Sequence, residues 1–413
     1  MTGGAADTRQ PWNGERAGGS MSVTTEIAYK SLNHYGEILC GDRVQIVHRR
    51  DSDIVVLADG MGSGVRANML STLTSQIFAR MLEEGAHLDE CVETVVDTLP
   101  NDPVTHVSYS TFTVLQIFHD GRATLIEYEN PECVFIRDGE VLRIPQHERI
   151  AHGKVVNDYR FTVRTGDTFL LMSDGTIHAG VGQKNSFGWP WEDIADFALK
   201  SWKKGKSPMR QAIRLCDACN ELYDGRPGDD TTVACIRVTE EKVVHLMTGP
   251  AKNPDDDEKM VQEFMSGDDG VTRIVSGGTS ASIVSRVLGR PLQVSLDYED
   301  ADIPPMGEIE GIDLVTEGVL TLAEVIRLIR EYADTNKVNR AFFRKLDEPN
   351  AAARIARVFI EDCTSVVLYV GTAVNAAYQN PDLPLELGMR QNLTRQLTDA
   401  LRAIGRPVEL HLY

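Results

Sequence analysis

The sequence predicts an α+β protein with two domains in tandem. Its 413 residues are more than one domain usually needs. Up to about residue 237 the pattern runs from strands to helices and back to strands, whereas from Val243 onward strand, loop and helix alternate. Alternation of the second kind is typical of an α/β layer with a largely parallel sheet. We therefore expect a first domain over residues 25–240 and a second over residues 241–413.

Apolar spacing predicts the elements of the first domain. Apolar residues three and four apart indicate helices, and short alternating runs indicate strands. The expected helices are Val65–Leu82, Leu88–Leu99 and Met209–Tyr223. The expected strands are Asp53–Ala58, Ser110–Phe118, Ala123–Glu127, Cys133–Arg137, Glu140–Ile144, Thr168–Met172 and Thr232–Ile236. Asp-Gly pairs at 120–121 and 138–139 lie between such runs, which predicts hairpin turns there.

The second domain is predicted from repeated strand–loop–helix units. The expected strands are Val243–Met247, Thr272–Val275, Ile312–Val315, Ser365–Val370 and Val408–Leu412. The expected helices begin near Ala281 or span Leu322–Tyr332 and Leu387–Ile404. An acidic run at 255–258 suits the positive end of a further helix.

Composition excludes several classes of function. The formal net charge of −19 argues against nucleic acid as a partner, because phosphate binding needs a basic face. No apolar run approaches the ~18 residues of a membrane span, and the first 20 residues lack the apolar core of a signal peptide. Seven scattered cysteines suit a reducing compartment. We expect a cytoplasmic protein whose residues 1–24 are a disordered leader, with Met21 as an alternative natural start.

Acidic residues stand where three apolar strands of the first domain begin or end. Asp59-Gly60 and Asp174-Gly175 each follow such a strand, and Asp229 precedes another. Strand ends fix the position of a carboxylate, and glycine lets the backbone turn so that its carbonyl also faces the site. Hard divalent cations prefer oxygen ligands of this kind. Because clustered carboxylates would repel one another without cations, the set predicts a metal site.

Together with Asp42 in Cys40-Gly41-Asp42, these motifs occur in the order of a known family. Three more motifs follow at appropriate spacing, namely the run Asp59 to Gly64, Ser173-Asp174-Gly175, and Gly228-Asp229-Asp230-Thr231-Thr232. They resemble the metal-dependent PPM/PP2C serine/threonine phosphatases, in particular their bacterial SpoIIE-like branch, over roughly residues 25–240. The resemblance implies a PP2C-like α/β/β/α sandwich and a protein-serine/threonine phosphatase activity.

The same resemblance implies two Mn²⁺ or Mg²⁺ ions and the residues that hold them. Asp59 would bridge both ions and the Gly60 carbonyl would bind one, whereas Asp174 and Asp229 would hold the other. Asp42 would act mainly through a metal-bound water. Two ions about 3.5–4 Å apart can activate a shared water for in-line attack on a phosphorus atom. They also neutralise charge on the phosphoryl oxygens.

Two positions depart from the family pattern. Met61 stands where the eukaryotic branch has a histidine thought to be the general acid. The SpoIIE-like branch commonly has methionine there, so the proton donor stays unidentified. Residues Glu129–Glu132 replace an Asn-Ala-Gly-His-Pro-like turn, which affects the expected substrate contacts and not the metals. In this branch the helices after the metal loop are thought to shift and complete the site, so Val65–Leu82 is expected to carry regulation as well as core packing.

Two alternatives stay open. A PP2C fold that retains its metal could serve as a non-catalytic scaffold or sensor, although all four acidic positions are kept. Gly62, Gly64 and Ala67 also match the G-x-G-x-x-A fingerprint of dinucleotide-binding proteins. Asp59 would repel a pyrophosphate there, and no second strand with a ribose-binding acid follows. The dinucleotide interpretation is therefore the weaker alternative.

The second domain resembles no family that we recognise, and its expected function depends on its loops. Gly277, Gly278, Thr279 and Ser280 lie between a strand and a helix, where N–H groups and hydroxyls can bind an anion. A tight turn with an N-cap is the alternative. We expect a sensing or regulatory domain for an anionic small molecule.

The expected partner of the first domain is a phosphorylated protein in bacterial signalling. The family suggests a STAS-type anti-sigma-factor antagonist as that substrate. The sequence leaves the oligomeric state open, and a homodimer is among the states that it allows.

Overall fold

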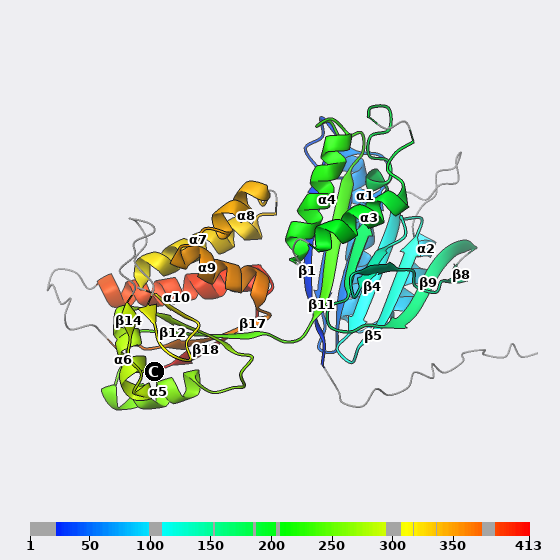
Figure 1. Ribbon diagram of the computed structural model, residues 1–413. Coiled ribbons are helices and arrows are strands. Elements are labelled where there is room, and N and C mark those ends of the chain that lie inside the picture. The colour runs from blue at the N-terminus through cyan, green and yellow to red at the C-terminus, as the bar shows by residue number, and fades with distance from the viewer. Residues whose placement is uncertain are drawn as a thin grey trace, which may run out of the picture.

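The computed structural model describes residues 22–98, 110–151, 153–184, 187–203, 207–294, 307–316, 318–335, 337–373 and 385–413. Most of the predicted leader, residues 1–21, lies outside these ranges. Two units follow one another along the chain, each with its own β-sheets (Figure 1). The last strand of the first, β11 (Thr231–Thr239), is followed by the first strand of the second, β12 (Val243–Thr248). Among the described residues, no helix combines the length and the apolar character that crossing a bilayer needs.

Two antiparallel sheets form the first domain. The six-stranded sheet has the order β2-β3-β4-β5-β9-β8 and the five-stranded sheet the order β1-β11-β10-β6-β7. Their bounds are β1 Thr24–Leu32, β2 Asp42–His48, β3 Ser52–Gly60, β4 Ser110–Phe118, β5 Arg122–Tyr128, β6 Val134–Arg137, β7 Glu140–Leu142, β8 His147–Ala151, β9 Lys154–Thr162 and β10 Thr168–Met172. The turn between β6 and β7 has positive φ at both Asp138 and Gly139, as a two-residue hairpin requires.

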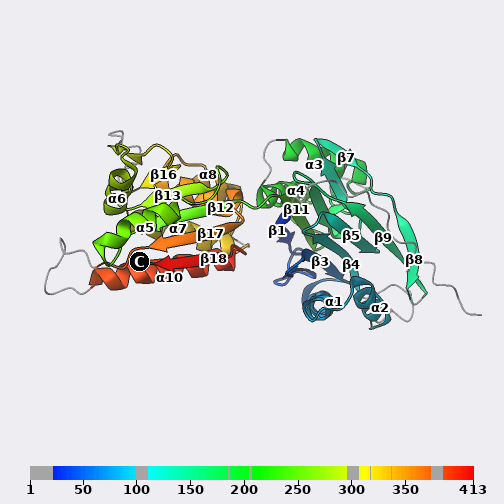
Figure 2. The same ribbon diagram turned by 90° about the horizontal axis from the view of Figure 1, so that it is seen from below.

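A hydrophobic core lies between the two sheets, and helices cover their outer faces (Figure 2). Val55 and Leu57 of β3 face this inner core, whereas Ile54 and Val56 face outward, following the two-residue period of a strand. Helices α1 (Gly64–Glu83) and α2 (Leu88–Thr98) pack on the six-stranded sheet. Helices α3 (Trp191–Trp202) and α4 (Pro208–Leu222) pack on the five-stranded sheet. The layers run α/β/β/α, so the predicted fold class is confirmed.

A mostly parallel sheet forms the second domain, in the order β14-β15-β16-β13-β12-β17-β18. The bounds are β13 Thr272–Ser276, β14 Gln293–Val294, β15 Gly307–Glu308, β16 Leu314–Thr316, β17 Ser365–Val370 and β18 Val408–Leu412. In the sheet, β16, β13, β12, β17 and β18 pair in parallel in that order, and β14 and β15 add an antiparallel edge. Among the parallel strands the first in sequence, β12, lies in the middle, as in doubly wound sheets. The predicted α/β layer with a largely parallel sheet is therefore also confirmed.

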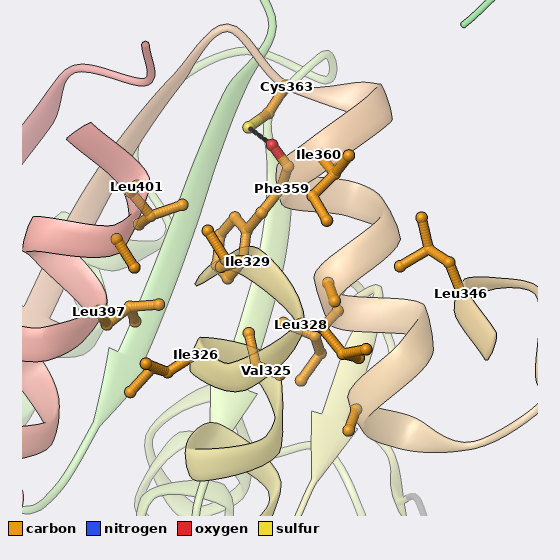
Figure 3. Packing of buried hydrophobic residues seen from close by; sticks show 14 of the residues in the cluster. Val325, Ile326, Leu328, Ile329, Leu346, Phe359, Ile360, Cys363, Leu397 and Leu401 are labelled. Atoms are coloured by element: carbon orange, nitrogen blue, oxygen red, sulfur yellow. Dashed lines mark hydrogen bonds between the residues drawn. The ribbon is translucent and has the colours of Figure 1, made fainter. Parts of the chain in front are cut away.

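Helices cover both faces of this sheet. One face carries α7 (Val319–Ala333), α9 (Ala351–Arg357), the π-helical turn η3 (Val358–Asp362) and α10 (Leu385–Ala403). Figure 3 shows the core on this face, where Ile329 of α7, Phe359 of η3 and Leu401 of α10 pack together. The opposite face carries α5 (Asp257–Phe264), preceded by η2 (Pro254–Asp256), and α6 (Gly278–Leu288). Helix α8 (Arg340–Leu346) lies between α7 and α9 in the chain.

The sequence patterns do not predict β1, β2, β8, β9, β14, β15, α3, α8 or α9. Strand β9 contains Asn157, Asp158 and Arg160, so its apolar alternation is interrupted. Helices α8 and α9 have only 7 residues each, which is too short for a helical period to stand out.

Candidate metal centre

Two strands of the six-stranded sheet place Asp42 and Asp59 side by side. Asp42 begins β2, Asp59 is the penultimate residue of β3, and the two are opposite one another in the antiparallel register. The strand residues before Asp59, from 54 to 58, are buried, so packing fixes the strand end. Ser110 Oγ donates a hydrogen bond to the Asp59 carbonyl oxygen at 2.8 Å. The register therefore presents both carboxylates at the same end of the sheet.

Gly60 is required where β3 meets α1. A Cβ atom at this position would lie 2.0 Å from the carbonyl oxygen of Ala67. The Gly60 amide donates to the Gly41 carbonyl oxygen at 3.2 Å, and Gly62 and Gly64 have φ angles of +96° and +69°. Glycine alone allows helix and strand to approach this closely. The glycines after Asp59 thus serve the sharp turn into α1.

The five-stranded sheet contributes Asp174 and Asp229 from neighbouring strands. Asp174 begins the short helix η1 (Asp174–Thr176) just after β10, and Asp229 lies two residues before β11. A Cβ atom at Gly175 would lie 2.1 Å from the carbonyl oxygen of Asp230, so the two loops pass at a distance that only glycine allows. Tyr223, directly after α4, donates its hydroxyl to the Gly175 carbonyl oxygen at 2.7 Å. The Asp174 loop is therefore held from both sides.

The carboxyl groups of the two sheets meet at one end of the sandwich, and three of them have a raised pKa. Burial, and then Asp42, Asp174 and Asp229, raise the pKa of Asp59 well above its ordinary value. Burial and Asp174 raise the pKa of Asp229 to about 6. Burial also raises the pKa of Asp42 to about 7, although hydrogen bonds from Ser173 and Thr232 oppose the shift. Such mutual repulsion is what a bound cation would relieve.

Asp42 has one satisfied and one unsatisfied oxygen. Its Oδ2 accepts a hydrogen bond from Ser173 Oγ at 2.7 Å, and Ser173 Oγ accepts one from the Thr232 amide at 2.8 Å. Its Oδ1 is buried and has no hydrogen-bond partner among the described residues. A buried carboxylate oxygen without a partner costs free energy. A cation or its hydration water would satisfy this oxygen.

His178 belongs to the same centre, although the sequence motifs do not single it out. One potential ligand atom from each of Asp174, His178 and Asp229 lies within 4.8 Å of the other two. His178 Nδ1 is 3.8 Å from Asp174 Oδ2, and the imidazole is 52% exposed. The i, i+4 spacing from Asp174 is the signal that could have indicated it. Carboxylate oxygens and an imidazole suit a divalent cation, so the residues present fit a metal site.

Asp230 supports the loop next to the carboxylates. Its Oδ1 accepts a hydrogen bond from the His34 amide at 2.9 Å. Its Oδ2 is buried without a partner among the described residues, beside Gly41, where an added Cβ would lie 2.7 Å away.

The two positions that depart from the family pattern, Met61 and the turn Glu129–Glu132, also lie in the first domain. Met61 follows the Asp59 loop and is 40% exposed. Asn130, in the divergent turn, accepts a hydrogen bond from Thr111 Oγ1 at 2.5 Å and donates to Thr113 Oγ1 at 3.1 Å. This turn is therefore tied to β4 through the Asn130 amide.

The predicted ligand loop Gly277–Ser280 lies in the second domain and not at the metal centre. Gly277 precedes α6 with a φ angle of +115°. Gly278 and Thr279 are exposed, whereas Ser280 is buried. Ser280 Oγ already accepts from the Gly249 amide at 2.8 Å and donates to the Ser276 carbonyl oxygen at 3.3 Å. Within this loop, Ser280 thus has a structural role.

The dinucleotide-binding interpretation of Gly62, Gly64 and Ala67 is wrong. Strand β3 pairs antiparallel with both β2 and β4, and α1 leads into α2. A dinucleotide fingerprint needs a parallel βαβ unit, which this segment lacks. Ala67 lies instead against Gly60.

Known proteins resemble the same part of the chain. Residues 50–239 match the family model described as Stage II sporulation protein E (SpoIIE). Over 200 residues the chain is 23% identical to stage II sporulation protein E of Bacillus subtilis, covering 44% of this chain and 22% of that protein. The chain therefore spans about a fifth of the length of this curated relative.

Several solved structures are similar over about half of the chain. The PP2C domain of Bacillus subtilis SpoIIE, with a fragment of its regulatory domain, has 20% identity and a TM-score of 0.46, covering 54% of this chain and 66% of that one. The RsbU and RsbW domains of a Mycobacterium tuberculosis protein have 16% identity and a TM-score of 0.45, covering 60% and 69%. The PPM Ser-Thr phosphatase MsPP from Mycobacterium smegmatis has 17% identity and a TM-score of 0.37, covering 51% and 97%.

The family match and the carboxylate centre coincide in the chain. The matched residues 50–239 contain Asp59, Asp174 and Asp229 and most strands of both sheets. The curated relative belongs to the same family. The first domain of this chain is accordingly a SpoIIE-like domain.

Proposed function

We propose that the first domain is a metal-dependent phosphatase that hydrolyses phosphoserine or phosphothreonine on a protein substrate. The observation that carries this proposal is the carboxylate centre itself. Four aspartates from two sheets approach at one end of the sandwich, where burial and the neighbouring carboxylates raise the pKa of Asp42, Asp59 and Asp229. When bound there, two Mn²⁺ or Mg²⁺ ions would supply an activated water and neutralise the phosphoryl oxygens.

Each residue of the centre has a place in this proposal. Asp59 would ligate both ions and the Gly60 carbonyl one of them. Asp174 and Asp229 would ligate the other ion, and His178 is an additional candidate ligand beside them. Asp42 would act from the start of β2, next to Asp59, in the orientation that Ser173 fixes by its hydrogen bond. The buried Ser173 side chain thus positions a carboxylate without contacting the substrate.

Hydrolysis of p-nitrophenyl phosphate and of a phosphoserine peptide by the full chain tests this function. Turnover should require Mn²⁺ or Mg²⁺ and stop with EDTA. Asp174→Asn should lower kcat by roughly 10²–10³-fold, the usual effect of losing one electrostatic stabiliser. Asp193→Asn, an exposed carboxylate in the first turn of α3, is the matched control and should retain activity.

The same measurements distinguish a phosphatase from a non-catalytic scaffold or sensor. Turnover that survives EDTA or Asp174→Asn would contradict the proposed mechanism. Tight Mn²⁺ binding with no turnover of either substrate would favour the non-catalytic scaffold or sensor.

For the natural substrate we propose a phosphorylated STAS-type anti-sigma-factor antagonist, on the basis of the family resemblance. Purified phosphorylated antagonists, followed by phosphate-affinity electrophoresis, test this step. They should lose phosphate faster than a phosphopeptide of the same sequence. Equal rates would remove this substrate class and leave the phosphatase activity intact.

We also propose that the second domain binds an anion at Gly277–Ser280. Ser276 and Thr316 are opposite one another at the carboxyl ends of β13 and β16. Their hydroxyls and that of Thr321, in the first turn of α7, are buried without a hydrogen-bond partner among the described residues. The Gly277 amide donates to the Thr316 carbonyl oxygen at 2.8 Å, which brings the start of α6 next to these hydroxyls.

Binding of inorganic phosphate to the full chain in EDTA, measured by calorimetry, tests the anion site. Thr316→Val removes one hydroxyl and keeps the shape, so it should weaken binding by roughly tenfold. Unchanged affinity in this variant would place any bound phosphate elsewhere.

A further inference from the structure

The two domains make direct contact through polar and apolar side chains. Arg210 of α4 pairs with Asp347 at 2.6 Å and with Glu361 at 2.6 Å, both in the second domain. Lys30 of β1 donates its ammonium group to the Thr335 carbonyl oxygen at 2.7 Å. Ala28, Met209 and Ile213 of the first domain belong to the hydrophobic cluster of the second. The relative position of the domains is therefore defined by a packed interface.

A cationic cleft of about 610 Å³ lies at this interface. Arginine and lysine side chains dominate its lining, together with Phe197 and Phe343. The five cations are Lys200, Arg210, Arg214, Arg340 and Arg344. They occur in a chain with a formal net charge of −19. The lining holds one carboxylate, Asp347, against these five cations, so the cleft is basic although the protein as a whole is acidic.

Two of the cleft cations are neutralised within the protein and three are not. Arg210 has its two carboxylates, and Arg340 pairs with Asp217 at 2.6 Å. Among the described residues, Lys200, Arg214 and Arg344 have no carboxylate within ion-pair distance. Arg214 only donates to the Ser201 carbonyl oxygen at 2.9 Å. Burial and the nearby Arg210 and Arg340 lower the pKa of Arg214, which reflects this crowding of positive charge.

We propose that the cleft binds a small molecule with two or more phosphate groups, which bridges the domains. Lys200 and Arg214 of the first domain and Arg344 of the second would contact its phosphates. Guanidinium groups match phosphate oxygens in geometry and charge. A volume of this size is typical of sites for nucleotide-sized molecules. The bound anion would replace repulsion between like charges by attraction to both sides.

One helix connects this cleft with the metal centre. Helix α4 carries Arg210 and Arg214 near its start. Tyr223, at its other end, donates to the Gly175 carbonyl oxygen, next to Asp174. An anion in the cleft would therefore bind to the same helix that contacts the metal loop. This connection makes the cleft suited to a regulatory ligand of the first domain.

Calorimetric titration of the full chain with inorganic pyrophosphate, and separately with ADP, tests the proposal. EDTA is present throughout, so that no phosphate binds through metal ions. We expect saturable binding to the cleft, whose Kd rises by roughly ten- to hundredfold in Arg214→Gln and in Arg344→Gln. Arg330→Gln, an exposed arginine of α7, is the matched control and should leave Kd unchanged. Tighter binding of ADP than of pyrophosphate would identify a nucleotide, and equal binding a simple phosphate chain.

Two controls distinguish loss of a phosphate contact in the cleft from binding at another site or loss of the fold. Thr316→Val, at the separate anion site, should not alter pyrophosphate binding to the cleft. Thermal melts without ligand check the fold, and Arg214→Gln should melt close to wild type because it loses one hydrogen bond, to the Ser201 carbonyl oxygen, and no ion pair. The proposal is overturned if neither probe binds up to millimolar concentration. It is also overturned if Kd is the same in wild type and both arginine variants.

Discussion

Both domains collect polar side chains at the ends of apolar strands, but the chemistry that they collect differs. The first domain places carboxylates there, with Asp42 and Asp59 from one sheet and Asp174 and Asp229 from the other. The second places hydroxyls there, on Thr248, Ser276 and Thr316 in mutual register. Strand packing fixes the positions in both cases. On the proposals made above, the residue type would then select the ion, a cation in the first domain and an anion in the second.

The two sites also differ in what they cost the protein without a ligand. Crowded carboxylates repel one another, so their pKa values rise. Unpartnered hydroxyls carry no charge and lose only the hydrogen bonds that water would have provided. The first site should therefore be the more costly to keep empty.

The largest difference is expected between two glycine substitutions. Gly60→Ala forces a Cβ to 2.0 Å from the Ala67 carbonyl oxygen, whereas a Cβ at Gly278 meets nothing within 4 Å. Gly60→Ala should lower the free energy of unfolding by about 2–3 kcal/mol and abolish metal-dependent activity. Gly278→Ala should stay within about 0.5 kcal/mol of wild type. Urea denaturation measures both, and equal effects would contradict the close approach of β3 and α1.

Removing one carboxylate should stabilise the metal-free first domain. Asp42→Asn keeps the shape and takes away a buried charge whose pKa is raised to about 7. We expect the free energy of unfolding in EDTA at pH 8 to rise by roughly 1–4 kcal/mol, while Mn²⁺ affinity falls. A less stable variant in EDTA would show that the Asp42 carboxylate is already satisfied within the protein.

The pH dependence of stability follows from the same carboxylates. The pKa of Asp42 is raised to about 7 and that of Asp229 to about 6, both from 3.8. Groups with a raised pKa contribute stability that is present below the ordinary value and is lost as pH rises through the folded value. Wild-type protein in EDTA should therefore lose more unfolding free energy between pH 5 and pH 8 than Asp42→Asn. Parallel pH profiles for the two proteins would be inconsistent with these shifts.

The smallest effects are expected from two serines of the second domain. Ser276 Oγ is buried without a partner among the described residues, so Ser276→Ala should leave stability unchanged or raise it by up to about 1 kcal/mol. Ser280 Oγ bonds to the Gly249 amide and the Ser276 carbonyl, so Ser280→Ala should cost about 1 kcal/mol. Thermal melts of the two variants should shift in opposite directions or differ clearly. A loss in Ser276→Ala as large as in Ser280→Ala would mean that its hydroxyl is satisfied.

The sequence predicts most of the fold, because long apolar runs with a clear period decide most elements. Strand Thr168–Met172 and helix Val65–Leu82 are examples in which the structure differs by at most a residue at either end. It does not predict β9, whose polar residues interrupt the alternation, or α8, which is too short. The local sequence pattern also does not predict that β3 pairs antiparallel with both of its neighbours. That pairing excludes the dinucleotide-binding interpretation.

The candidate site is predictable only where a motif repeats a family pattern. Asp59, Asp174 and Asp229 follow from their order and their strand ends. His178 is not part of the family motifs, and its i, i+4 spacing from Asp174 becomes informative only together with the short distance between the two side chains. The orphaned Oδ1 of Asp42 and the hydrogen bond from Ser173 depend on tertiary contacts between the sheets. The cationic cleft joins α3 and α4 of the first domain to α8 of the second. The basic residues of positions 200–214 are visible in the sequence, but their approach to Arg340 and Arg344 depends on how the domains pack.

Titration of the full chain with Mn²⁺, followed by the loss of the electron paramagnetic resonance signal of free Mn²⁺, tests the central claim most directly. We expect saturable binding at pH 8 that weakens strongly at pH 5, where Asp42 and Asp229 are protonated. Binding should be lost in Asp174→Asn and kept in Asp193→Asn. Equal Mn²⁺ affinity in wild type and Asp174→Asn would contradict the assignment of this carboxylate cluster as the metal centre.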